Sequence, residues 1–155
     1  MSNLREVEQA IAVIFTPGID RATRTAAQER CDALKNAPGA LESACQLFQA
    51  SEVPEVRFWC LQTLEELLNY KFAALNESER AGLRHWLVLV ACQGGGVRSA
   101  EPFLANKLAQ VYALLMRQEY PEQWPDAMQA LLRNLEAGED VVWMFIRVLR
   151  AVDVE

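Results

Sequence analysis

The pattern of apolar and polar positions along the chain predicts an all-α protein. Apolar residues recur every three or four positions, as they do on one face of an α-helix, and the two-residue alternation of a half-buried strand is not sustained anywhere. Eight helices are expected, separated by turn and capping residues. Their expected ranges are 2–15, 20–36, 39–51, 54–73, 77–92, 101–119, 122–137 and 139–152.

The breaks between these segments carry residues that start or stop helices. Asn76 stands three residues before Glu79, which is the spacing of a capping box at the start of the fifth helix. Proline suits the first turn of a helix, and proline or glycine also ends one. Such residues mark the other breaks, at Pro17-Gly18, Pro38-Gly39, Pro54, Pro102, Pro121 and Gly138.

The expected helices recur with a period that indicates repeats. Odd-numbered helices begin near residues 2, 39, 77 and 122, and even-numbered ones near 20, 54, 101 and 139. A helix pair about every 40 residues is the period of HEAT and armadillo repeats, whose pairs stack on their neighbours. The predicted fold is therefore an α-α superhelix of about four antiparallel helix pairs. The longer third repeat carries its extra residues in Gly94-Gly95-Gly96, which we expect to be a linker.

The even-numbered helices divide into an apolar side and a polar side. In the fourth helix the expected packing residues are Val56, Cys60, Leu61, Leu64, Leu67 and Leu68, and the polar residues are Gln62, Glu65, Glu66 and Asn69. In the sixth they are Leu104, Leu108, Val111 and Leu115, with a row of Asn106, Gln110, Ala113 and Arg117. We expect the stem of Lys107 to pack while its charge reaches solvent.

The eighth helix is expected to bury one apolar face and to show a basic pair. The residues predicted to be buried are Val142, Phe145, Ile146 and Leu149. The basic pair is Arg147 and Arg150. A solvated face is the simplest interpretation of all these polar rows. Repeat proteins of this kind bind partners along one face, so some of the rows are expected to be contact surfaces.

Charge and composition narrow the function. The chain has 155 residues, of which 52% are hydrophobic, and it carries 15 Lys and Arg against 21 Asp and Glu, for a net charge of −6. It can bury a core, and it lacks the clustered basic charge of a nucleic-acid sheath. No apolar run approaches the length of a membrane span, so no membrane association is expected.

Side chains that could carry catalysis or bind a metal are few and scattered. The four cysteines are separated by 14, 15 and 32 residues, which excludes a CxxC metal or redox motif and predicts small buried thiols. The single histidine, His85, lies about two helical turns from Cys92, too far for direct contact. The triple glycine is not part of a phosphate-binding loop. We therefore expect no enzyme activity, no metal and no cofactor.

Three segments together resemble a known family. They are Arg57–Glu65 followed by Tyr70-Lys71-Phe72, then Pro102–Val111, then Glu119-Tyr120-Pro121-Glu122-Gln123-Trp124-Pro125. Their order and spacing resemble the N-terminal region of the importin-β superfamily of nuclear transport receptors, and in particular its exportin branch. The last two segments and the ending Met144–Asp153 look most like the exportin-T family of tRNA exporters, especially its plant form. Tyr120 stands where exportins commonly have Trp, which favours this family over exportin-1.

The resemblance implies a function and partners. It implies that residues 1–155 are the N-terminal part of a longer receptor that binds the GTPase Ran in its GTP form, shuttles between nucleus and cytoplasm through contacts with nuclear pore proteins, and carries tRNA. Ran contacts would come from the inner helices, which makes the candidates Gln62, Glu65, Glu66, Asn69, Asn106, Lys107, Gln110 and Arg117. The candidates for cargo contact are Arg147 and Arg150. Two alternatives stay open: an exportin that carries protein cargo, and a HEAT-type scaffold without any link to Ran.

Overall fold

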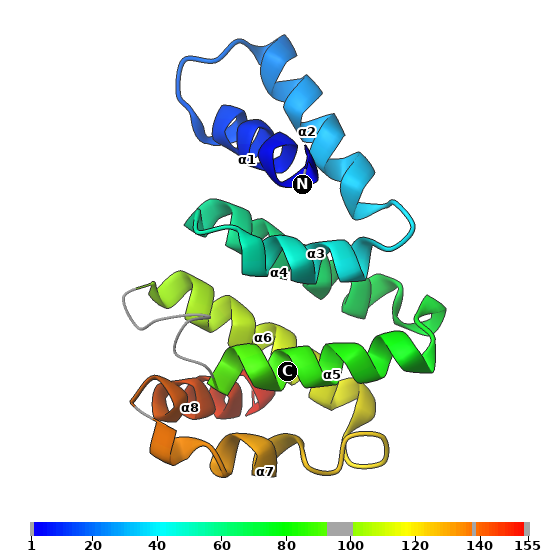
Figure 1. Cartoon of the computed structure of the whole chain (residues 1–155), viewed down its shortest axis with the longest axis vertical. Helices are drawn as coiled ribbons and strands as arrows, with labels where there is room; N and C mark the ends of the chain where they lie inside the picture. The colour runs from blue at the N-terminus through cyan, green and yellow to red at the C-terminus, as the bar shows by residue number, and fades with distance from the viewer. Residues whose placement is uncertain (1, 93–100, 138, 154–155) are drawn as a thin grey trace. The chain divides into compact units, whose positions relative to one another are not determined.

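The chain is all-α, as a computed structural model shows for residues 2–92, 101–137 and 139–153 (Figure 1). Within these ranges there is no β-strand. The α-helices are α1 (Ser2–Phe15), α2 (Arg21–Lys35), α3 (Ala40–Ala50), α4 (Pro54–Tyr70), α5 (Glu77–Cys92), α6 (Pro102–Glu119), α7 (Ala127–Leu132) and α8 (Glu139–Asp153). Two short 3-10 helices are η1 (Phe72–Ala74) and η2 (Leu135–Ala137). The predicted fold class is confirmed, and the expected linker at Gly94–Gly96 and the glycine at 138 lie outside the described residues.

The N-terminus of α5 confirms the predicted capping box. The Asn76 side chain accepts from the Glu79 N–H at 2.8 Å, and the Glu79 carboxylate accepts from the Asn76 N–H at 3.1 Å. Two backbone donors at the start of the helix are thereby satisfied. This local contact explains why the predicted start of α5 agrees with the structure.

The seventh helix was predicted at 122–137, and that prediction is wrong. The N–H groups of Gln123 and Trp124 both donate to the Glu119 carbonyl, at 2.9 and 3.1 Å, so the chain makes a tight turn there. Pro125 lacks an N–H and disfavours helical geometry in the preceding residue. The helix therefore begins only at Ala127 and ends at Leu132, and η2 follows it. The fourth helix is also shorter than predicted, since η1 replaces its last residues.

The described chain forms two compact units, and the boundary between them falls inside α4, after Thr63. In the first unit α1 packs against α2. The Ser51 hydroxyl, next to α3, donates to the Glu8 carboxylate of α1 at 2.9 Å. The Arg57 guanidinium lies 5.1 Å from the ring centre of Phe48, which is fully buried. These contacts give the first unit a core of its own.

In the second unit the even-numbered helices lie side by side and run in the same sense. Glu65 of α4 pairs with Lys107 of α6, and further along both helices the Leu68 carbonyl accepts from Gln118. In the same way, α6 contacts α8 through Asn106 with Arg147 and through Arg117 with Ala151. Helix α5 packs against α6 and α7. One layer of parallel even-numbered helices and one of odd-numbered helices is the arrangement of HEAT-like repeats.

The core confirms two of the three predicted packing faces. All six apolar residues predicted on α4 and all four on α6 are buried. On α8 the prediction is wrong: Val142 and Leu149 are exposed, and Phe145 and Ile146 are only half-buried. The buried residues of this helix are Val141, Met144 and Val148. These face the neighbouring helices of the second unit, since α8 contacts α5, α6 and α7.

The cysteines are free thiols and agree in part with the predicted burial. Cys31 and Cys60 are fully buried, whereas Cys45 and Cys92 are half-buried. Burial raises the pKa of Cys45 and that of Cys60 from 9.0 to about 12, so both are neutral thiols near pH 7. Among the described helices, none combines the length and apolar character that a bilayer span requires.

Candidate functional site

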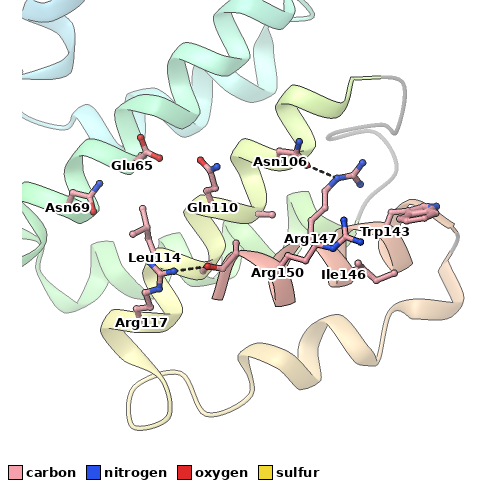
Figure 2. A pocket seen from close by; sticks show the side chains of 13 residues that line it. Glu65, Asn69, Asn106, Gln110, Leu114, Arg117, Trp143, Ile146, Arg147 and Arg150 are labelled. Atoms are coloured by element: carbon pink, nitrogen blue, oxygen red, sulfur yellow. Dashed lines mark hydrogen bonds between the residues drawn. The ribbon is translucent and has the colours of Figure 1, made fainter. Parts of the chain in front are cut away.

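A groove in the second unit collects the most prominent polar side chains of α4, α6 and α8 (Figure 2). Its volume is about 710 Å³. We call it the arginine groove, because three arginines line it. Its lining residues are Glu65, Asn69, Asn106, Ala109, Gln110, Ala113, Leu114, Arg117, Trp143, Ile146, Arg147, Arg150 and Ala151.

Two of the three arginines are held in place by α6–α8 contacts. The Arg147 Nε donates to the Asn106 side-chain oxygen at 2.9 Å, and an Arg117 terminal nitrogen donates to the Ala151 carbonyl at 2.6 Å (Figure 2). Each guanidinium has five N–H donors, so one such bond orients the group without using up its donors. Arg150, one turn after Arg147, is exposed. The arginines thus present a partly pre-organised set of donors.

Glu65, the carboxylate among the described lining residues, is already neutralised. Both oxygens of Glu65 accept from the Lys107 Nζ at 2.9 Å, and the two side chains are 24% and 14% exposed. The prediction that the charge of Lys107 reaches solvent is therefore wrong, because the ion pair keeps it at the α4–α6 contact. Three arginines also line the groove, in a chain whose net charge is −6.

The remainder of the groove combines free amides with small and apolar side chains. Asn69 and Gln110 are exposed, and Ala109 and Ala113 are buried beneath them. Trp143 at the α8 side of the groove is 48% exposed. Such a surface can hold an anion and, next to it, an apolar group.

The structure brings together most of the side chains that the sequence marked as contact candidates. Five of the eight candidates for Ran contact line the groove: Glu65, Asn69, Asn106, Gln110 and Arg117. Lys107 lies behind them in its ion pair, and Glu66 is half-buried outside the lining. Gln62 is half-buried and belongs to the first unit. The two cargo candidates, Arg147 and Arg150, line the same groove, next to Arg117.

Sequence reasoning missed the apolar part of the groove. Trp143 and Ile146 lie four residues before Arg147 and Arg150, respectively, and therefore on the same face of α8. This spacing could have identified the apolar part of the groove from the sequence. It was overlooked because Ile146 was assigned to the buried face.

The family-typical segment at the end of α6 has a structural role. Glu119 is buried, with a side chain 1% exposed, and accepts from Arg84 of α5 at 2.7 Å; Arg84 also pairs with the exposed Glu77 at 2.7 Å. Nearby, the Tyr112 and Trp124 rings have centres 4.8 Å apart, and both rings are buried. We call this set, Arg84, Glu119, Tyr112 and Trp124, the α5–α6–α7 joint. It fixes the turn that leads to α7.

The lone histidine is not part of a metal cluster within the described residues. His85 is exposed on α5 and lines a hollow of about 570 Å³ together with Ala130 of α7 and Arg133, which follows α7 and pairs with Asp126 at 3.2 Å. No group of three His, Cys, Asp or Glu side chains in the described ranges is placed to hold a metal ion.

Comparisons with known proteins agree with this architecture. Residues 27–92 match the family model of the importin-beta N-terminal domain, and residues 101–155 match that of the exportin 1-like proteins. Exportin-T of Arabidopsis thaliana is 34% identical over 97% of this chain and 16% of its own length. Exportin-T of Homo sapiens is 28% identical over 96% of the chain and 16% of its length. Exportin-1 of Schizosaccharomyces pombe is 26% identical over 66% of the chain and 10% of its length.

These matches, together with the layered helix pairs, place the chain in a class: it belongs to the importin-β/exportin superfamily. Within that superfamily it is a homologue of exportin-T, with relatives in plants, animals and Dictyostelium discoideum. The chain spans about one sixth of the length of the Arabidopsis thaliana and Homo sapiens exportin-T relatives and one tenth of that of the exportin-1 relative.

Proposed function

We propose that this chain is the N-terminal region of a nuclear export receptor for tRNA and that it binds Ran in its GTP form. The observation that carries the proposal is the similarity to exportin-T, which extends over 97% of the chain. The match of residues 27–92 to the importin-beta N-terminal domain supports the same assignment. The receptor would carry its cargo through the nuclear pore, in contact with pore proteins, and would shuttle between nucleus and cytoplasm.

The exposed polar side chains of α4 and α6 are the proposed Ran surface. Asn69, Gln110 and Arg117 are exposed, and Glu66, one turn before Asn69 on α4, is half-buried. Asn106 and Lys107, which pair with Arg147 and Glu65, hold this surface in shape. Binding of Ran and of cargo would be mutually strengthening, because a coupling free energy between two sites is reciprocal.

The tRNA would be held mainly by parts of the receptor beyond these residues. Residues 1–77 contain seven basic and eleven acidic residues, and residues 78–155 contain eight and ten. Arg147 and Arg150, with Arg117, would supply only a few phosphate contacts, and such contacts weaken steeply as salt increases. In a gel shift at physiological salt, we expect the isolated chain to bind tRNA weakly or not at all, with or without Ran.

The nucleotide state of Ran tests the proposal. We expect the chain to bind GTP-loaded Ran more tightly than GDP-loaded Ran, as measured by biolayer interferometry with immobilised Ran. Equal affinity for the two forms would refute it and would favour a HEAT-type scaffold without a link to Ran. An exportin with protein cargo is the second candidate, favoured by the similarity to exportin-1. Tests of tRNA export by the full-length receptor separate it from the first.

A further inference from the structure

Tyr70, the last residue of α4, carries the most exposed large apolar side chain in the part of the chain that the structure describes, at 82%. A tyrosine in a folded protein is usually partly covered. Its ring brings apolar area, and its hydroxyl can donate and accept a hydrogen bond. At this exposure the ring adds little to the core, so the stability of the fold does not account for it.

The backbone on both sides of Tyr70 is held in place by neighbouring helices. Before it, the Leu68 carbonyl accepts from the Gln118 side chain of α6 at 3.4 Å. After it, Arg80 of α5 donates to the Phe72 carbonyl at 2.9 Å, and its guanidinium lies 4.0 Å from the centre of the Phe72 ring. An exposed aromatic side chain on a fixed backbone loses little conformational freedom when a partner binds it.

The position of Tyr70 continues the proposed Ran surface. Tyr70 lies four residues after Glu66, and therefore on the same face of α4, and directly after the exposed Asn69. Glu66 and Asn69 both belong to that surface, whereas Tyr70 neither lines the arginine groove nor belongs to the polar rows. Interfaces commonly surround a central aromatic residue with a polar rim.

We propose that Tyr70 is the aromatic anchor of the surface that binds Ran in its GTP form. The inference rests on the proposed function and adds to it a side chain that the polar rows do not contain. A few residues, among which tyrosine is enriched, carry most of the binding energy of an interface, and the contacts around them contribute little. The loss of Tyr70 should therefore weaken binding more than the loss of a neighbouring polar side chain.

The charge around Tyr70 favours a protein partner over a nucleic acid. An exposed ring can also stack on a base, but proteins that hold single strands set such rings in a positively charged groove. Between Arg57 and Arg80 the sequence has Lys71 as its one basic residue, against the acidic residues Glu65, Glu66, Glu77 and Glu79. This acidic stretch repels phosphates and leaves a protein surface as the partner for the ring.

The test is the binding of the whole chain to immobilised Ran, loaded with GTP or with GDP, by biolayer interferometry. Tyr70→Ser should weaken the binding of GTP-loaded Ran by at least about tenfold. Tyr70→Phe keeps the ring and should lose no more than a few fold. Because the side chain is exposed, both variants should melt at the temperature of the unchanged chain, as followed by circular dichroism.

The matched control is Phe15→Ser. Phe15 is also an aromatic last residue of its helix and is 65% exposed, but it belongs to α1 in the first unit. Its substitution should leave the affinity for GTP-loaded Ran nearly unchanged.

The outcomes separate this inference from the proposed function. If the unchanged chain prefers GTP-loaded Ran and Tyr70→Ser binds it equally well, or if Phe15→Ser weakens binding as much, the anchor is refuted and the proposed function stands. Equal affinity of the unchanged chain for both forms of Ran refutes the proposed function and the anchor with it. If Tyr70→Ser lowers the binding of labelled tRNA at low salt and leaves that of Ran unchanged, the ring stacks on bases and the inference is wrong.

Discussion

The arginine groove and the α5–α6–α7 joint use similar residues for opposite purposes. In the joint, Glu119 is buried and its charge is matched by Arg84 at 2.7 Å. In the groove, Arg150 of α8 and Gln110 of α6 are exposed. Both regions lie along α6, within the second unit. The difference separates a buried, paired polar residue that stabilises the fold from exposed polar residues that a partner could reach.

The largest loss of stability should come from substitutions in the core that both regions share. Leu64→Ala or Leu108→Ala removes a side chain that is fully buried, and each should lower the free energy of unfolding by about 2–5 kcal/mol. Chemical denaturation followed by circular dichroism measures this. Wild-type stability in both variants would contradict the packing described for α4 and α6.

In the α5–α6–α7 joint, the buried Glu119 should contribute more to stability than Glu77, the exposed partner of the same Arg84. Glu119→Ala removes a buried charged hydrogen bond and should cost about 1.5–3 kcal/mol. Glu77→Ala is the matched control, because Glu77 binds the same Arg84 but is 69% exposed, so its loss should cost less than about 1 kcal/mol. Equal costs would show that the burial of Glu119 contributes nothing.

Loss of the capping residue Asn76, which lies outside both regions, should have a smaller effect on the free energy of unfolding. Asn76→Ala removes the acceptor for the Glu79 N–H and should cost about 0.5–2 kcal/mol. Asn76→Asp retains an acceptor and should cost little. Thermal melting of the two variants measures the difference in stability. Equal losses of stability in both would rule out the capping role.

The smallest effect on stability, with the clearest effect on binding, is expected on the proposed Ran surface. Glu66→Ala with Gln110→Ala should change the free energy of unfolding by less than about 1 kcal/mol. The same pair should weaken binding of GTP-loaded Ran. The control pair is Glu42→Ala with Gln49→Ala, on exposed positions of α3.

The comparison of α6 with α8 shows how well the sequence alone predicts the buried face of a helix. On α6 the polar residues Asn106, Gln110 and Arg117 follow one helical face, and the four apolar residues predicted to pack are all buried. Ala113, which was placed in the polar row, is buried as well. On α8 apolar residues occupy adjacent stripes, one through Val142 and Leu149 and one through Val141, Met144 and Val148. Helical spacing fits both stripes, and only packing against α5, α6 and α7 selects the second.

The candidate site was predictable residue by residue but not as a groove. The rows on α4 and α6 and the basic pair on α8 follow from helical spacing. That Arg147 meets Asn106, and that Lys107 meets Glu65, depends on how neighbouring helices are staggered, which no local pattern records. The late start of α7 has a local cause, the prolines on either side of Trp124, and sequence reasoning gave Pro125 too little weight.

The central claim is that the even-numbered helices of the second unit form the surface that binds Ran in its GTP form. Hydrogen–deuterium exchange of the chain, alone and with GTP-loaded Ran, tests it most directly. The account predicts slower exchange in α6 and in α4 from Leu64 onward, with GTP-loaded but not GDP-loaded Ran, and little change in α5 and α7. Protection confined to α5 and α7, or equal protection by both forms of Ran, would contradict it.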